Sequence, residues 1–308
     1  MNWVVLTPAW GERHVALLES VVLPAILAAA GGASGSVRFI VHTDQPERLA
    51  RVFSFTCHGV EFRDPVACNE RDSRHIKMSA CHRDGVALVA DGDCVAIINA
   101  DMVPSLEVFS AAESRFEQGK RLIICMAPRT IAGDEHPPIG TKSADLLKWA
   151  WAHPHQWTTD CIWDKGRSRI PSVLFFERDG SVVMHGFHLH PFAFVKDRPL
   201  TFGTTVDLDL AELYTIDEMH VVTSADELSF AEISPVSQDL GRQATKLGFE
   251  NVAKWAIHTL PMHHWQFCHP IAIVGDGSDI GDRAVCSELL AEIAKIRQPV
   301  KSRWRQPH

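Results

Sequence analysis

Short apolar runs and helical periods alternate along the first 127 residues. Four runs rich in β-branched and other strongly apolar residues predict buried strands, at 3–6, 37–41, 95–98 and 122–126. Between these runs, apolar residues recur at steps of three and four, which is the period of a helix. Strand, helix and strand at this spacing form crossover units. The sequence therefore predicts an α/β fold with a mostly parallel central sheet flanked by helices.

Local signals predict where the helices begin, bend and end. Apolar positions over 15–29 share one face of a first helix, which Pro24 should kink and Gly31 should end. A weaker helical pattern covers 77–90. Ser105 is a candidate N-cap for a third helix, since its hydroxyl could accept a hydrogen bond from the first turn.

The pattern loosens beyond residue 130. A strand is expected near 172–177, whereas 212–223 and 228–233 each fit either a strand or a short helix. From about residue 243 the chain has a helical period again.

Length and charge limit the classes of protein to consider. The chain has 308 residues, and 30 Lys and Arg against 38 Asp and Glu give a net charge of −8. This balance argues against nucleic acid or an anionic membrane as a partner, because both are bound by clustered Lys and Arg. The length predicts one large domain, or one domain with an appendage. We expect that domain over 1–242, in halves of 1–127 and 128–242, and a C-terminal helical cap over 243–308.

Cysteines and apolar segments indicate the compartment. The eight cysteines include no C-x-x-C pair, which argues against a zinc ribbon or a thioredoxin-like site, and scattered thiols suit a reducing compartment. The first residues lack the basic and apolar regions of a signal peptide. No run of about 18 apolar residues predicts a transmembrane segment. A cytoplasmic protein is therefore expected.

Polar residues follow three of the predicted strands at the edge where parallel sheets bind ligands. The first strand leads to Thr7, Pro8 and Trp10, the second to Thr43 and Asp44, and the third to Asn99 and Asp101. An acid that follows a buried strand suits a divalent ion bridging phosphate oxygens. The alternative is that Asp101 caps the next helix or closes a turn.

The apolar run at 95–98 and the sequence Asn99-Ala100-Asp101 after it resemble the D-x-D motif of glycosyltransferases with the GT-A (Rossmann-like) fold. Residues 3–127 resemble the nucleotide-binding half of these enzymes. The resemblance implies a nucleoside diphosphate sugar donor and a Mn²⁺ or Mg²⁺ ion held by Asp101, although Asn99 stands where the motif has its first acid. It places the donor against Thr7, Pro8, Trp10, Thr43, Asp44, Lys77, Asn99 and Asp101.

Two later clusters are candidates to complete the site. His188 and His190 alternate in an extended segment and would point to the same face, where the resemblance implies a histidine ligand of the ion. The alternative is a pair of structural histidines. Asp207 and Asp209 would share one face of a strand, and either could be the general base for an acceptor hydroxyl. The alternative for these acids is a solvated edge.

Three further patterns are weaker candidates for function. Asp91-Gly92-Asp93 spells D-x-D, but it precedes the apolar strand, and Asp-Gly is ordinary turn chemistry. The segment 271–281 resembles a dinucleotide-binding strand and loop, but its glycine spacing is wrong and its aspartates would repel a pyrophosphate. Four tryptophans over 149–163 suit either stacking on a sugar acceptor or packing of a loop-rich region.

The sequence thus predicts a glycosyltransferase that moves a sugar from a nucleoside diphosphate sugar to a hydroxyl of a glycan acceptor. Asp207 is the expected base if the reaction inverts the anomeric centre. The nearer alternative is a sugar-nucleotide nucleotidyltransferase, for which only Gly11-Glu12-Arg13 offers anything like a phosphate loop. The farther alternative is a non-catalytic binding protein that keeps the GT-A-like sheet without the full D-x-D.

Overall fold

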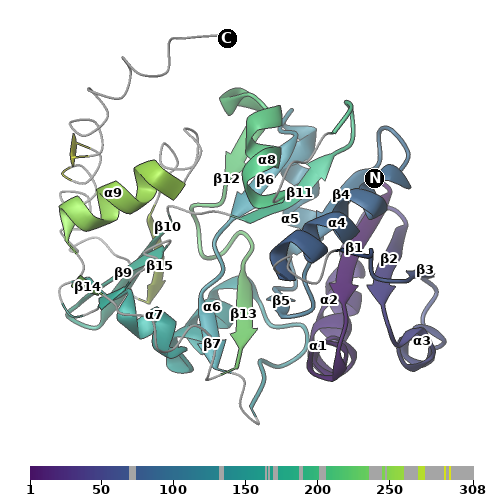
Figure 1. Ribbon diagram of the computed structural model, residues 1–308, viewed down its shortest axis with the longest axis horizontal. Coiled ribbons are helices and arrows are strands. Elements are labelled where there is room, and N and C mark those ends of the chain that lie inside the picture. The colour runs from purple at the N-terminus through teal and green to yellow at the C-terminus, as the bar shows by residue number, and fades with distance from the viewer. Residues whose placement is uncertain are drawn as a thin grey trace.

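The computed structural model describes most of the chain up to residue 235 and shorter stretches beyond it (Figure 1). The described residues are 1–68, 74–131, 135–163, 165, 167–168, 173–186, 190–200, 206–235, 245–246, 248–259, 270–274, 288 and 291–292.

A seven-stranded sheet in the order β12-β6-β11-β4-β1-β2-β3 forms the centre of the molecule. Its strands are β1 (Trp3–Ala9), β2 (Val37–Thr43), β3 (Gly59–Arg63), β4 (Cys94–Ile97), β6 (Leu122–Cys125), β11 (His190–Val195) and β12 (Met219–Val221). Neighbouring strands are parallel, except that β11 runs antiparallel to both β4 and β6. The predicted mostly parallel α/β sheet is confirmed, and the four apolar runs are β1, β2, β4 and β6.

The first crossover is one long helix with a π turn in its middle. α1 (Glu12–Leu17) passes through the π-helical η1 (Leu18–Val22) into α2 (Leu23–Ala30). Pro24 has no N–H to donate to the preceding turn, and the widened turn just before it absorbs that loss in place of a sharp kink. The stretch Glu12–Ala30 is long and apolar enough to cross a membrane, but 56% of its most apolar part is buried inside the protein. Packing in the core accounts for its apolar composition.

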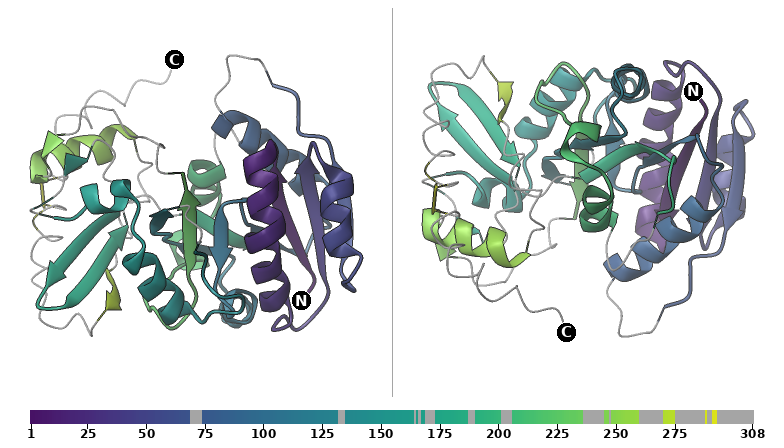
Figure 2. Two further views of the ribbon diagram at one scale, coloured as in Figure 1. Left: turned by 90° about the horizontal axis from the view of Figure 1, so that it is seen from below. Right: turned by 90° about the horizontal axis from the view of Figure 1, so that it is seen from above.

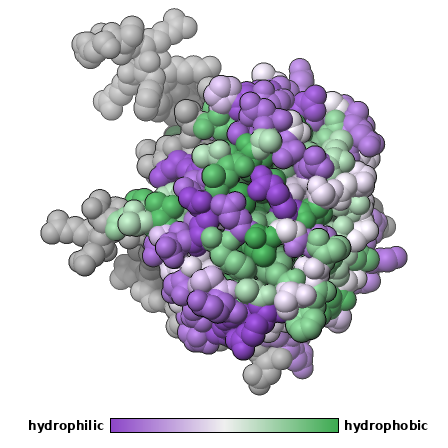
Figure 3. Space-filling model, turned by 90° about the vertical axis from the view of Figure 1, so that its right-hand side faces the viewer, coloured by the Kyte–Doolittle hydropathy of each residue, from purple (hydrophilic) through white to green (hydrophobic). Residues whose placement is uncertain are grey.

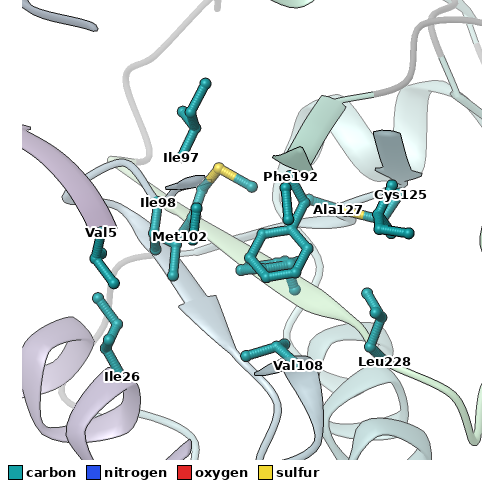
Figure 4. Packing of buried hydrophobic residues seen from close by; sticks show 14 of the residues in the cluster. Val5, Ile26, Ile97, Ile98, Met102, Val108, Cys125, Ala127, Phe192 and Leu228 are labelled. Carbon is teal, nitrogen blue, oxygen red and sulfur yellow. The ribbon is translucent and has the colours of Figure 1, made fainter. Parts of the chain in front are cut away.

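Helices lie on both faces of the sheet (Figure 2). Val5 points toward Ile26 of α2 (Figure 4), and the next residue, Leu6, points to the opposite face. There α4 (Arg74–Ala87) approaches β1 closely, because a Cβ at Gly85 would lie 2.9 Å from Leu6 Cδ2. α3 (Pro46–Phe53) follows β2, and α5 (Val108–Glu117) precedes β6.

Smaller sheets extend the fold beside the central one. One sheet has the order β5-β13-β7 and consists of β5 (Met102–Pro104), β13 (Phe230–Ser234) and β7 (Arg129–Ile131). Another has the order β15-β10-β9 and consists of β15 (Pro270–Val274), β10 (Ser181–Gly186) and β9 (Val173–Arg178). A short pair joins β8 (Arg167–Ser168) to β14 (Thr245–Lys246). The remaining helices are α6 (Ser143–Ala152), α7 (Gln156–Asp160), α8 (Val206–Leu213), η2 (Ile216–Glu218) and α9 (Phe249–Thr259).

Two local expectations are wrong. Ser105 does not cap α5, because a turn at 106–107 separates it from the helix, which begins at Val108. Its hydroxyl accepts the N–H of Ser229 at 3.1 Å instead. Asp207 and Asp209 lie on helix α8 and not on a strand. The prediction that they share one face of a strand is therefore wrong.

The segment after residue 243 contains the expected helix as α9, and it also contributes strands. β15 pairs antiparallel with β10, outside the central sheet. Residues 271–274 of the dinucleotide-like segment belong to β15, so this strand lacks the parallel setting of a dinucleotide site. Its glycine loop lies outside the described residues. The domain boundary at residue 242 stays a prediction.

The free edge of the central sheet at β3 lies on the side that Figure 3 shows. Hydrophobic residues in the middle of this face are surrounded by hydrophilic ones (Figure 3). Glu61 and Arg63 form an ion pair of 3.0 Å along the strand. Charged side chains on an edge strand disfavour pairing with another chain.

Candidate active site

The predicted donor residues lie at one edge of the central sheet. Leu6 of β1 pairs with Ile97 of β4, and Ala9 pairs with Thr43 of β2, all in parallel register. The carboxyl ends of these strands therefore meet, as the sequence predicts.

The loop after β1 forms a rim with β2 and α4. The N–H of Gly11 donates to both carboxylate oxygens of Asp44, at 3.2 and 3.1 Å. Gly11 has a φ of 74°, a conformation that side chains other than glycine rarely adopt, and it is the N-cap of α1. Lys77 Nζ lies 4.9 Å from the centroid of the Trp10 ring. Three predicted donor residues, Trp10, Asp44 and Lys77, are thus gathered at this rim.

The other predicted residues of β1 and β2 lie deeper. Pro8 and Thr43 are buried, and the Thr43 hydroxyl accepts the N–H of Gln45 at 3.1 Å. Thr7 is 1% exposed, and its hydroxyl has no hydrogen-bond partner among the residues that the structure describes. Pro8 and Thr43 therefore form part of the buried edge of the sheet. Thr7 has a hydroxyl that makes no hydrogen bond to the described residues.

Asp101 follows β4 through a tight turn and meets β13. The Met102 N–H donates to the Asn99 carbonyl at 3.0 Å, and the Ile233 N–H donates to the Asp101 carbonyl at 2.7 Å. Arg13 of α1 reaches the same place, where its Nη2 donates to the Ile233 carbonyl at 3.1 Å. The strand-end acid therefore faces the start of α1.

Four charged side chains surround this point. Burial, and then the charge of Glu232, raise the pKa of the Asp101 carboxyl, while Arg13 and Arg129 act in the opposite direction. Burial lowers the pKa of Arg13, and the attraction of Asp101 partly offsets that effect. Two carboxylates and two guanidinium groups thus lie close together. We call Arg13, Asp101, Arg129 and Glu232 the charged cluster.

Residues of α7 contact both the side chain and the backbone of Arg129. Its guanidinium carbon lies 4.8 Å from the centroid of the Trp157 ring, and its carbonyl accepts the Thr158 hydroxyl at 2.6 Å. His155 Nδ1 accepts the Trp157 N–H at 3.0 Å, and the other ring nitrogen lies 3.0 Å from the Pro235 carbonyl. That carbonyl can only accept, so Nε2 carries the proton and His155 is neutral. Trp157 thus positions the guanidinium group of Arg129 within the charged cluster.

The other three tryptophans of this region pack on rings of the protein. Trp149 stacks on His153, Trp151 packs on Phe175, and Trp163 contacts Phe176 and Phe249. Packing of the loop-rich region therefore accounts for their positions, and a role in acceptor stacking stays a prediction.

Sequence reasoning missed Arg129 and Glu232 as site residues and considered Arg13 only in the nucleotidyltransferase alternative. Arg129 follows the fourth predicted strand, at the same sheet edge as the other candidates, and this position was a usable signal. Glu232 is an acid inside the apolar run 228–233. This position was a weaker signal of a site residue.

The predicted histidine ligands are only partly described. His188 lies outside the described residues. His190 begins β11, whose antiparallel course along β4 brings this end to the carboxyl edge that holds Asn99 and Asp101. Its role as a ligand stays a prediction.

Oxygen atoms at the charged cluster fit a hard divalent ion. Asp101 and Glu232 provide carboxylates, and the buried Oδ1 of Asn99 has no partner among the described residues. Mg²⁺ and similar ions take one or two carboxylates and complete their shell with water and substrate phosphates. Within the described residues, no group of three or more His, Cys, Asp or Glu side chains could hold a metal ion. A site on this edge therefore requires oxygen ligands from the substrate or from solvent.

The two acids proposed as bases lie on α8, which packs against β11. Asp207 is the second residue of that helix, and its side chain is outside the part that the structure describes. Asp209 is half-buried. Their catalytic role stays a prediction.

The literal D-x-D lies in a turn at the opposite edge of the sheet, as predicted. Gly92 has a φ of 91°, and its N–H donates to the Lys196 carbonyl at 2.7 Å. Lys196 Nζ lies 3.3 Å from the Asp91 carboxylate. A surface cavity of about 610 Å³ opens beside these residues, at the amino ends of the parallel strands.

Asp93→Asn should leave nucleotide-sugar binding unchanged, because Asp93 lies at the amino edge of the sheet. Isothermal titration with nucleoside diphosphates and Mn²⁺ measures this, with Asp101→Asn as the comparison. A loss of binding in Asp93→Asn but not in Asp101→Asn would move the donor site to the opposite edge.

Comparisons with known proteins give a loose likeness of fold. No family model matches the chain, and no curated protein matches its sequence. A crystal structure of S. aureus TarS residues 1–349 with UDP-GlcNAc is 9% identical, covers 96% of this chain and 72% of that chain, and has a TM-score of 0.44. A second structure of TarS 1–349 is 10% identical with the same coverage and a TM-score of 0.39. A structure of TarS is 11% identical, covers 96% and 43% of the two chains, and has a TM-score of 0.38.

Proposed function

We propose that this chain is a glycosyltransferase that moves a sugar from a nucleoside diphosphate sugar to a hydroxyl of a glycan acceptor. The observation that carries the proposal is the charged cluster at the carboxyl edge of β1 and β4, next to the rim of Trp10, Asp44 and Lys77. An open α/β sheet binds its ligand at this edge. The resemblance of Asn99-Ala100-Asp101 to the D-x-D motif supports the same site.

The donor would lie across the strand ends. The nucleoside would contact the rim, where Trp10 offers an aromatic face and Asp44 a carboxylate held by Gly11. The diphosphate would lie toward Arg13, whose planar guanidinium suits phosphate oxygens. In this arrangement the bond between sugar and diphosphate would lie beside Asp101.

The reaction separates a charged leaving group from the sugar. A Mn²⁺ or Mg²⁺ ion held by Asp101, with His188 or His190 as the predicted further ligand, would supply charge stabilisation to the departing diphosphate. Arg13 would add a fixed positive charge beside the same oxygens. If the reaction inverts the anomeric carbon, Asp207 or Asp209 would take the proton of the acceptor hydroxyl. A retaining reaction would need no such base.

A panel of nucleoside diphosphate sugars with Mn²⁺ tests this function. We expect slow release of the nucleoside diphosphate with one donor in wild type, and a far slower release in Asp101→Asn. Binding of a sugar nucleotide without turnover, in the presence of candidate glycan acceptors, would indicate a binding protein in place of an enzyme.

One contact supports a sugar-nucleotide nucleotidyltransferase as the second candidate. Arg13 is a basic residue just after β1, and its charge acts on Asp101. A nucleotidyltransferase would release pyrophosphate from a nucleoside triphosphate and a sugar 1-phosphate. Pyrophosphate detection with the same protein separates the two reactions.

A further inference from the structure

We propose that Glu232 supplies the second carboxylate of the divalent-cation site, in place of the acid that the D-x-D pattern has at Asn99. This inference rests on the proposed function and deepens it. It assigns a ligand from β13, about 130 residues beyond Asp101 in the chain.

Strand pairing brings Glu232 beside Asp101. β13 lies between β5 and β7, and Glu232 is the register partner of Met102 on one side and of Arg129 on the other. The next residue, Ile233, donates its N–H to the carbonyl of Asp101 at 2.7 Å. The pairing therefore places the backbone of Glu232 one residue from the position opposite Asp101.

Glu232 is less buried than its neighbours on β13. The flanking Ala231 and Ile233 are fully buried, whereas the side chain of Glu232 is 16% exposed. Side chains alternate between the two faces of a strand, so Glu232 lies on the face opposite to its apolar neighbours.

One oxygen of Glu232 is held, and this positions the other. Arg129 Nε lies 2.9 Å from Oε1, and the Ser234 hydroxyl donates to the same oxygen at 3.0 Å. Within the described residues both contacts fall on Oε1, which leaves Oε2 as the oxygen for a cation. The Arg129 contact is an ion pair and the Ser234 contact is a hydrogen bond. Carboxylate ligands of metal ions are typically oriented by hydrogen bonds like that from Ser234.

Charge balance favours a divalent ion when the donor binds. Asp101 and Glu232 offset the two arginines of the charged cluster, so the cluster by itself is close to neutral. The diphosphate of a donor then brings negative charge that the cluster does not offset. A divalent ion between the two carboxylates and the diphosphate would restore the balance. The unpartnered Oδ1 of Asn99 is a neutral oxygen that could orient a water on that ion.

An ion pair that only joins β13 to β7 is the alternative role of Glu232. Arg129 and Glu232 face each other across the two strands, and this pair alone could stabilise the small sheet. A structural role predicts a lower melting temperature in Glu232→Gln with unchanged cation binding. A ligand role predicts weaker cation binding with little change in the melting temperature.

Mn²⁺ binding, followed by electron paramagnetic resonance without nucleotide, separates these roles. Glu232→Gln should raise the Kd for Mn²⁺ about tenfold or more, as should Asp101→Asn. Glu117→Gln is the matched control, because Glu117 is an exposed acid at the end of α5, at the amino edge of the sheet, and it should bind Mn²⁺ like wild type. A thermal melt of each variant verifies that it is folded.

Restoring the missing acid gives the sharpest test. Adding Asn99→Asp to Glu232→Gln should recover most of the lost Mn²⁺ affinity, because the number of carboxylates returns to two. If Glu232 only forms an ion pair that joins β13 to β7, this rescue is not expected. Glu232→Asp keeps the charge on a shorter side chain, so it should weaken Mn²⁺ binding several-fold even if Glu232→Gln does not fold.

The inference is wrong if Glu232→Gln or Glu232→Asp binds Mn²⁺ like wild type, or if the wild type and Asp101→Asn bind it equally. The proposed function survives either result if nucleoside diphosphate is still released from a donor. Absence of that release with every donor and acceptor contradicts the function instead, whatever the Mn²⁺ data show.

Discussion

Asp101→Asn is expected to lower the rate of sugar transfer about 10³-fold while leaving the melting temperature nearly unchanged. The carboxylate is the predicted ligand of the ion that stabilises the leaving diphosphate, and metal-assisted charge stabilisation is worth several kcal/mol. The stability of the fold should not decrease, because the neutral amide of asparagine has nearly the shape of the carboxylate and removes the repulsion between Asp101 and Glu232. The release of nucleoside diphosphate, beside a thermal melt, measures both effects.

Asn99→Ala is the graded comparison for that experiment. Its amide oxygen is neutral and can only orient a water or a ribose, so we expect a smaller loss of rate than in Asp101→Asn. Near-full activity of folded Asp101→Asn would contradict the assigned site, and so would a loss of activity that follows only from unfolding.

Trp3→Ala should lower the free energy of unfolding by about 3–5 kcal/mol. Trp3 is 0% exposed, and its ring lies 5.0 Å from the ring of Phe109 and 5.8 Å from that of Phe116. Its indole N–H also donates to the Glu113 carboxylate at 2.8 Å. Removing the side chain leaves a cavity and takes one partner from a buried acid. Urea denaturation at constant pH measures the change.

Two variants separate these contributions. Trp3→Phe keeps most of the apolar ring but loses the indole N–H, so its cost should be about 1–3 kcal/mol. Trp10→Ala is the control for the residue type, because Trp10 is at the half-buried rim. It should change stability by about 1 kcal/mol or less and weaken nucleotide binding. Equal destabilisation by Trp3→Ala and Trp10→Ala would contradict this description of the core.

The first half of the fold was predictable because its strands are buried on both faces. Continuous apolar runs mark β1, β2, β4 and β6 whatever packs around them. The segment Val-Asp-Leu-Asp-Leu at the start of α8 misled the same reasoning, since a short alternation fits a strand as well as a helix. The Leu, Ala and Glu that follow favour a helix, and α8 continues through them.

The candidate site was predictable as far as it depends on strand ends. Asp101, Trp10 and Asp44 follow parallel strands, and the geometry of such sheets brings them to one edge. Glu232 and Arg129 were not found, because their place depends on the pairing of β13 with β5 and β7. Periodicity describes the neighbours of a residue along the chain, and it does not tell which distant strands pair.

The antiparallel strand β11 also constrains the order in which the chain can fold. It lies between β4 and β6, so these two strands are not neighbours until His190–Val195 has joined them. Cys125 and His190, which are in contact across β6 and β11, are 65 residues apart. Contacts of such long sequence separation form slowly, because a long loop must close first. A nascent chain that ends before β11 therefore exposes the unpaired edges of β4 and β6, and the central sheet closes only when this late strand is inserted.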